Sequence, residues 1–148
     1  MNRPMYESKE DLTHEAKMKI FLEVKWNCTL QKLPLKYQLD WLAMRGKDPY
    51  AFIEFKHREK LSLNAYPRYM ISLDKWMKAK QLCKEVEIPF IMVITFTEGT
   101  YYGVFVNNAL HDVTYGFGGR YDRGDAQDVE PMVYLPLNIF KKIIFGSE

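Results

Sequence analysis

Residues 50–58, YAFIEFKHR, place a carboxylate and an amine close together in a stretch that is otherwise typical of a buried strand. Side chains two positions apart on a strand lie on the same face. Glu54 and Lys56 therefore point the same way, whereas Phe55 points to the opposite face. Because buried charges require partners, the segment indicates either a structural ion pair at a sheet edge or part of a polar reaction centre.

Asp40 supplies a second carboxylate to the same region of the expected sheet. Residues 37–44 alternate with a period of two, and residues 46–49, GKDP, have the composition of a turn. We therefore expect residues 36–57 to form a β-hairpin in which Asp40 and Glu54 are near neighbours on one face. Two such carboxylates repel each other unless they share a proton or a cation. Their oxygens are hard ligands that suit Mg²⁺ or Mn²⁺.

The elements that must position these groups begin with a helix, which we expect over residues 8–24. Leu12, Ala16 and Ile20 recur at every fourth position, as on one face of a helix. At about 100° per residue, Glu15 borders this apolar stripe and can face the sheet. A glutamate on the solvent side of the helix is the alternative interpretation.

The middle of the chain indicates a loop, a second helix and two strands. We expect residues 58–71 to form a polar loop and Ser72 to cap a helix over residues 73–87. The apolar run at residues 89–96 suits a central strand that is covered on both faces. Residues 101–106 suit a further strand.

The C-terminal segment carries weaker patterns. Residues 116–131 are rich in turn-forming and charged residues. Residues 132–136 read as a last edge strand, and residues 137–144 as a short helix.

The order of elements, α-β-β-β-α-β-β, predicts an α/β fold of mixed α+β character, with a central mixed sheet flanked by helices. The length favours one domain over residues 1–148. Within it we place a core at about residues 8–106 and a C-terminal extension at residues 107–148.

The spacing of the three charged residues on this framework is similar to that of a known family. Asp40 is followed, after thirteen residues, by the tripeptide Glu54-Phe-Lys56, with one helix before the hairpin and a long helix after it. This arrangement resembles the PD-(D/E)XK nuclease superfamily, and small phage-encoded members in particular. The resemblance covers about residues 8–106 and implies a restriction-endonuclease-like core, αβββαβ, with an extra C-terminal segment. Leu39 stands where the family motif usually has proline.

The resemblance also implies a metal site. Asp40, Glu54 and the backbone carbonyl of Phe55 would hold a divalent ion, Mg²⁺ or Mn²⁺. Family members often carry a glutamate on the first helix that contacts this site, and Glu15 is the best-placed candidate here. A structural ion pair at Glu54 and a strand-end cap at Asp40 are the alternative interpretations.

Two lysines would complete the catalytic set that the family implies. Lys56 would orient the attacking water and neutralise charge that develops on the phosphate. Lys75 lies in the first turn of the second helix, on its apolar side, and would offset phosphate charge from there. Lys78 is the second choice for this position, and a solvated amine near a helix start is the alternative for Lys75.

Nucleic-acid binding requires positive charge near the site. Residues 56–80 carry seven cationic side chains against two acidic ones, whereas the whole chain has a net charge of only +2. Contacts of this kind bind phosphate without reading sequence, and Tyr66 and Tyr69 could stack on bases. An ordinary solvated loop is the alternative. The cations that we expect to contact nucleic acid are Arg58, Lys60, Arg68, Lys78, Arg120 and Arg123.

These observations predict a metal-dependent nuclease that hydrolyses phosphodiester bonds, with DNA as the expected partner. The alternative from another class is a catalytically inactive nuclease-fold module that binds nucleic acid or protein. The sequence does not decide between DNA and RNA, between duplex and branched substrates, or between a monomer and the homodimer that many small enzymes of this fold form.

Composition limits the remaining classes. No run of about 18 apolar residues is present, so no membrane span is expected. Cys28 and Cys83 have no metal-ligand spacing and are expected to be free thiols. We therefore expect a cytoplasmic protein, located in the host cytoplasm if it is phage-encoded.

Overall fold

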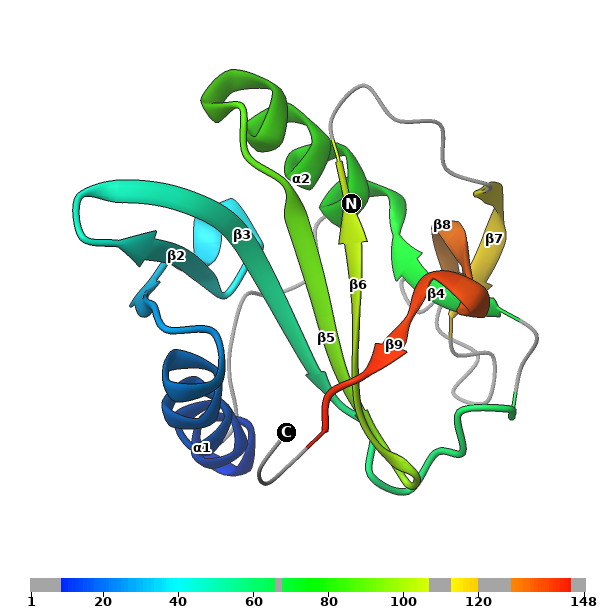
Figure 1. The fold of residues 1–148 in the computed structure, drawn as a ribbon. Coiled ribbons are helices and arrows are strands. Elements are labelled where there is room, and N and C mark those ends of the chain that lie inside the picture. Colours follow the sequence, from blue (N-terminus) through cyan, green and yellow to red (C-terminus); the bar gives the residue numbers. More distant parts are fainter. Residues whose placement is uncertain (1–8, 66–67, 107–112, 120–128, 145–148) are drawn as a thin grey trace.

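The computed structural model describes residues 9–65, 68–106, 113–119 and 129–144. Within these residues, the strands form two sheets, and helices pack against them (Figure 1). The elements in chain order are α1 (Lys9–Lys25), β1 (Thr29–Lys32), η1 (Leu35–Tyr37), β2 (Trp41–Arg45), β3 (Asp48–His57), β4 (Arg68–Ser72), α2 (Leu73–Val86), β5 (Phe90–Phe96), β6 (Gly99–Phe105), β7 (Thr114–Gly119), β8 (Val129–Pro136), η3 (Leu137–Ile139) and β9 (Lys141–Lys142).

The larger sheet has the strand order β1-β2-β3-β5-β6-β9. Strands β3 and β5 run parallel, and the other neighbouring pairs run antiparallel. The connection from β3 to β5 passes through β4 and α2, which gives the crossover that parallel strands need. The predicted α/β fold with a central mixed sheet is therefore confirmed, and β5 is an inner strand because its run FIMVITF is apolar on both faces.

Strands β2 and β3 form the predicted hairpin. Gly46 in its turn has a φ of 63°, a conformation that glycine adopts without strain. The first strand of the hairpin begins at Trp41 and not at residue 36, because Leu35–Tyr37 forms a 3-10 turn that ends at Gln38 in the left-handed region. Strand β1, which we did not locate from the sequence, pairs with β2 at the edge of the sheet.

The two helices pack on opposite faces of the larger sheet. Leu22 of α1 is buried in a cluster with Ile53. Trp76 of α2 is buried in a different cluster with Phe52. Since Phe52 and Ile53 are successive residues of β3, their side chains point to opposite faces. Figure 1 shows α1 beside the β2–β3 hairpin, and α2 near the start of β5 and the end of β6.

Helix α1 is present as predicted, but its expected apolar stripe faces solvent. Leu12 is 47% exposed and Ile20 is 65% exposed, and Ala16 is also exposed. Leu22 and Glu15 lie on the buried side instead. The reason is that a buried carboxylate with a lysine partner, described below, occupies the contact side of the N-terminal half of the helix.

Four expectations for the rest of the chain are corrected, the first three of them by a second sheet with the order β4-β8-β7. The predicted loop at residues 58–71 includes most of β4, and the turn-rich segment at residues 116–131 includes the end of β7 and the start of β8. Strand β8 is the middle strand of its sheet and not an edge strand. The helix expected at residues 137–144 is a 3-10 turn followed by β9. Burial explains the second sheet, because Ile71 and Val133 complete the core under α2.

Neither described helix has the length and apolar character needed to cross a membrane. Both cysteines are free thiols, as expected.

Candidate active site

The hairpin register brings Asp40 next to Glu54. Trp41 pairs with Ile53, so Asp40 lies one position beyond this pair, level with Glu54. The Asp40 amide donates to the Ile53 carbonyl at 3.1 Å. The Phe55 amide in turn donates to Asp40 Oδ2 at 2.8 Å. These bonds fix the carboxylate of Asp40 to the backbone of β3.

Glu54 is a buried carboxylate, with an exposed fraction of 1%. Its Oε2 atom pairs with the Lys75 ammonium group and lies 3.3 Å from Lys56 Nζ. Its Oε1 atom is buried and has no hydrogen-bond partner among the described residues. A buried carboxylate oxygen without a partner is costly, so this atom requires an explanation.

Lys75 reaches Glu54 because of how α2 begins. Ser72 Oγ accepts a hydrogen bond from the Lys75 amide at 3.2 Å, so the predicted N-cap is confirmed. This cap places Lys75 in the first turn, on the side that packs against β3. The lysine side chain is only 18% exposed, so its charge is partly removed from water.

Asp40 lies in an environment that disfavours its charged form. Burial and the nearby charges of Glu54 and Glu15 together raise the pKa of Asp40 to about 8, against the opposing hydrogen bond from Phe55. When acids repel one another in this way, the binding of a proton or a cation lowers the repulsion between them. The three predicted acids are therefore electrostatically coupled at Asp40.

Glu15 approaches Asp40 from α1. Its exposed fraction is 9%, and its Oε1 atom lies 2.5 Å from Nζ of Lys32 on β1. The helix-surface interpretation of Glu15 is therefore wrong. Lys32 was missed from the sequence, because nothing in a short edge strand shows which of its side chains will meet α1.

A model of the family described as "Phage putative PDDEXK endonuclease" matches residues 1–143. The chain belongs to this family. The resemblance inferred from Asp40, Glu54 and Lys56 is thereby confirmed at the level of the family.

A solved structure supports the fold of this phage endonuclease-family chain. The chain resembles Hjc of Archaeoglobus fulgidus, a Holliday junction resolvase from an archaeal hyperthermophile, with a TM-score of 0.50 and 13% sequence identity. The similarity covers 66% of this chain and 73% of Hjc. At this identity the comparison shows the restriction-endonuclease-like fold alone. No curated protein matches the chain.

The superfamily implies a divalent cation, and the side chains present fit one. No ready-made group of three or more His, Cys, Asp or Glu ligands occurs within the described ranges. However, Glu54 Oε1 is a buried oxygen without a hydrogen-bond partner among the described residues, and burial together with the nearby acids raises the pKa of Asp40 to about 8. Both features are those of a carboxylate site that lacks part of its positive charge.

The cations that we expect to contact nucleic acid differ in exposure. Arg58 and Lys60 are exposed just after β3. Arg68 and Lys78 are partly buried, and Arg68 Nη1 lies 3.5 Å from the Tyr134 carbonyl. The remaining two expected contacts, Arg120 and Arg123, lie outside the described residues.

Tyr69 has a different setting from the one expected. Its ring packs edge-on against Phe96, with centroids 6.0 Å apart and an interplanar angle of 85°, instead of projecting into solvent. Burial raises the pKa of Tyr69, and its hydroxyl neighbours include Arg58, Glu54 and Lys75. Tyr69 therefore belongs to the wall of the site. Tyr66 lies outside the described residues.

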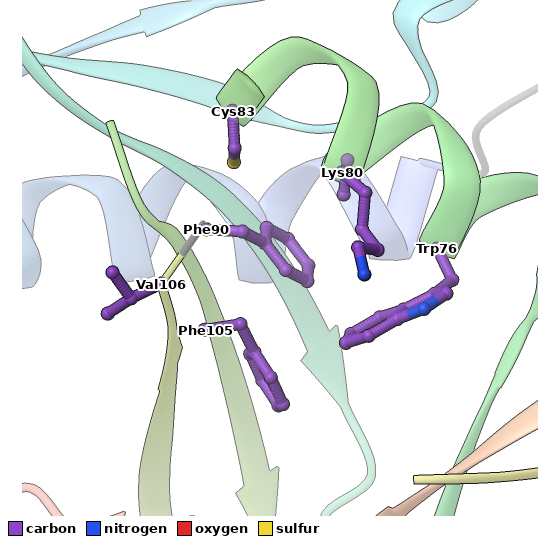
Figure 2. A pocket seen from close by; sticks show the side chains of 7 residues that line it. Trp76, Lys80, Cys83, Phe90, Phe105 and Val106 are labelled. Atoms are coloured by element: carbon purple, nitrogen blue, oxygen red, sulfur yellow. The ribbon is translucent and has the colours of Figure 1, made fainter. Parts of the chain in front are cut away.

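A separate hollow lies between α2 and the β5–β6 hairpin. Figure 2 shows Phe90, Phe105 and Trp76 around it, with the Lys80 side chain turned toward Trp76. The Lys80 ammonium group lies 5.8 Å from the Trp76 ring centroid. The described residues that line the hollow include no acidic side chain, so they do not supply the carboxylates that the proposed chemistry needs.

Proposed function

We propose that the chain is a metal-dependent deoxyribonuclease whose reaction centre consists of Asp40, Glu54 and Lys56, assisted by Glu15 and Lys75. The observation that carries this proposal is the arrangement around Glu54. A fully buried carboxylate has two lysines on one oxygen and a second carboxylate beside it, and its other oxygen has no hydrogen-bond partner within the described part of the chain. A purely structural ion pair has no need of the second acid.

Asp40, Glu54 and the Phe55 carbonyl would hold the divalent ion, Mg²⁺ or Mn²⁺, with Glu15 reaching it directly or through water. When bound, such an ion polarises a phosphate oxygen and lowers the pKa of a water molecule. Family membership supports this ligand set. So does the unpartnered Oε1 atom of Glu54.

The two lysines have different roles because they differ in exposure. Lys56 is 33% exposed, so its ammonium group can reach an attacking water and a substrate phosphate while it stays 3.3 Å from Glu54. Lys75 is more deeply placed, and it pairs with Glu54 and offsets phosphate charge from the side of α2. Substitution of either lysine removes positive charge from the region where negative charge develops.

The cations near the end of β3 would bind the DNA backbone. Arg58 and Lys60 are exposed there, and phosphate contacts of this kind give affinity without sequence preference. Branched DNA deserves a place among the test substrates, because the chain shares its fold with a Holliday junction resolvase. Since the family is described as phage-encoded, we place the reaction in the cytoplasm of the host cell.

The test is a cleavage assay with supercoiled plasmid, linear duplex, single-stranded DNA and a four-way junction. Each substrate is incubated with Mg²⁺, with Mn²⁺ or with EDTA. Glu54→Ala and Lys56→Ala should lose cleavage, whereas Lys84→Ala, an exposed lysine in the last turn of α2, should retain it. Absence of cleavage by the wild-type protein with either metal contradicts the proposal. Sedimentation of the protein with and without DNA tests for a homodimer.

The second candidate function is a catalytically inactive module that binds nucleic acid. The observation in its favour is that Lys56 and Lys75 already neutralise Glu54, and no ready-made metal cluster is present in the described segments. Binding of DNA by the wild-type protein without cleavage in any metal would favour this alternative.

A further inference from the structure

Two histidine rings from different elements lie face to face at the end of β3. His14 belongs to α1, and His57 is the last residue of β3. Their ring centroids are 3.6 Å apart, and the rings are inclined by only 12°. The contact therefore joins the N-terminal half of α1 directly to the strand that carries Glu54 and Lys56.

Contacts with neighbouring residues hold the His57 ring in place. Its Nε2 atom lies 3.2 Å from Glu59 Oε2, and its ring lies edge-on to Phe55 at 6.3 Å. The backbone after it is also held, because the Arg58 amide donates to the Thr95 carbonyl at 2.7 Å. A ring that is held on several sides can set the position of a partner that packs against it.

In the N-terminal half of α1, the histidine stack adds a second contact to the Glu15–Lys32 pair. Leu12 and Ala16 face solvent, so hydrophobic burial at these positions does not hold this half of the helix. Leu22, which is fully buried, lies two turns further along. Glu15, which follows His14 directly, must nevertheless be placed accurately, because it is a buried carboxylate that α1 contributes to the proposed site.

We propose that the stack of His14 on His57 is a positioning contact that fixes the N-terminal half of α1 and so places Glu15 in the reaction centre. The inference rests on the proposed nuclease function. Neither histidine acts on the substrate. Both histidines act by positioning Glu15. The stacking contact requires a flat ring at each of the two positions.

The test compares variants that remove a ring with variants that keep one. His14→Ala and His57→Ala remove the stack, whereas His14→Phe and His57→Phe keep a flat ring at the same position. Glu59→Gln controls for loss of the polar contact of His57. Hydrogen exchange of the amides of residues 12–18 reports the helix position without any substrate or metal.

Both alanine variants should raise exchange of these amides roughly 3- to 10-fold, the range expected from loss of one stacked pair. They should lower kcat/KM of DNA cleavage roughly 10- to 100-fold, as a small misplacement of a reacting group does. The phenylalanine variants and Glu59→Gln should keep most of the activity and the protection. In a Glu15→Gln background, His57→Ala should cause no further loss, because the histidine acts through Glu15.

Three results would overturn the inference. Exchange of residues 12–18 that is unchanged in both alanine variants shows that the stack does not hold the helix. Equal losses in the alanine and phenylalanine variants show that ring shape is not the requirement. Full activity of the alanine variants, when Glu54→Ala is inactive, rejects the positioning role and leaves the proposed function intact. Failure of the wild-type protein to cleave rejects the proposed function, and the catalytic placement of Glu15 with it.

Discussion

The Lys75 ammonium group pairs with the carboxylate of Glu54, which is 21 residues earlier in the chain. The two side chains come from different layers, since Glu54 lies on β3 and Lys75 lies in the first turn of α2. Because Glu54 is almost fully buried, this pair holds a charge in the interior. The contact therefore matters for stability as well as for the proposed reaction.

Replacement of Lys75 by methionine should destabilise the metal-free protein. The substitution keeps most of the apolar volume but removes the principal partner of a buried carboxylate, which destabilises a fold by about 3–5 kcal/mol when the charge is left unpaired. We expect a value near the lower end, because Lys56 remains 3.3 Å from the same oxygen. Urea unfolding in EDTA measures the change.

The matched control for Lys75 is Lys78→Met, one turn further along α2. This variant should differ from wild type by less than about 1 kcal/mol, as for most partly exposed lysines. The double variant Glu54→Gln with Lys75→Met should recover part of the lost stability, because no buried charge is left unpaired. Additive effects of the two substitutions would contradict a direct pairing.

Asp40 should make the stability of the metal-free protein fall with rising pH. Its pKa is raised from 3.8 to about 8 by burial and by the nearby acids. Between these values the unfolded chain has lost the Asp40 proton while the folded chain retains it. The Asp40 contribution is therefore fully present below pH 3.8 and is lost as pH rises to about 8.

Comparison with Asp40→Asn isolates this effect, because the other titrating groups are shared. Urea unfolding in EDTA at several pH values should show wild type losing stability relative to the variant, at a slope of up to about 1.4 kcal/mol per pH unit. Addition of Mg²⁺ should reverse the trend in the wild type only, since a bound cation favours ionised Asp40. Parallel stability curves for the two proteins would contradict a raised pKa.

The parts of the site that could be predicted depend on local patterns. The alternation around Glu54 and Lys56 identified β3, and Ser72 identified the start of α2 and hence the position of Lys75. The turn at Gly46 set the hairpin register that brings Asp40 beside Glu54. Each of these signals is contained within a short stretch of chain.

The parts that could not be predicted depend on contacts between distant segments. Strand β4 is a strand because it pairs with β8, whose paired residues lie 60 or more positions later, and nothing within its five residues indicates this partner. The buried face of α1 could not be predicted from the sequence for a similar reason. An apolar stripe normally marks the buried face, but here Glu15 is buried beside Lys32, and the hydrophobic pattern does not record that pairing.

Lys60 should contribute to DNA affinity through a phosphate contact. It is exposed three residues after the end of β3, in the most cationic part of the chain. Lys60→Ala should weaken DNA binding about equally for all sequences and should reduce the slope of log K against log salt by about 1. Fluorescence anisotropy in EDTA at several salt concentrations measures this slope. Lys84→Ala should leave the slope unchanged, and equal slopes for wild type and Lys60→Ala would show that Lys60 does not contact DNA.

Gly103 tests whether the C-terminal segment is an integral part of the core. A Cβ atom at this position of β6 would lie 3.0 Å from the Phe140 ring, which is buried after η3. Gly103→Ala should therefore destabilise the fold by about 1–3 kcal/mol, as overpacking does. Phe140→Leu in the same chain should recover part of the loss, because it removes the crowding ring edge. Val104→Ala, at the neighbouring and more exposed position, should change stability by less than about 1 kcal/mol. A Gly103→Ala protein as stable as wild type would show that Phe140 does not pack on β6 in solution.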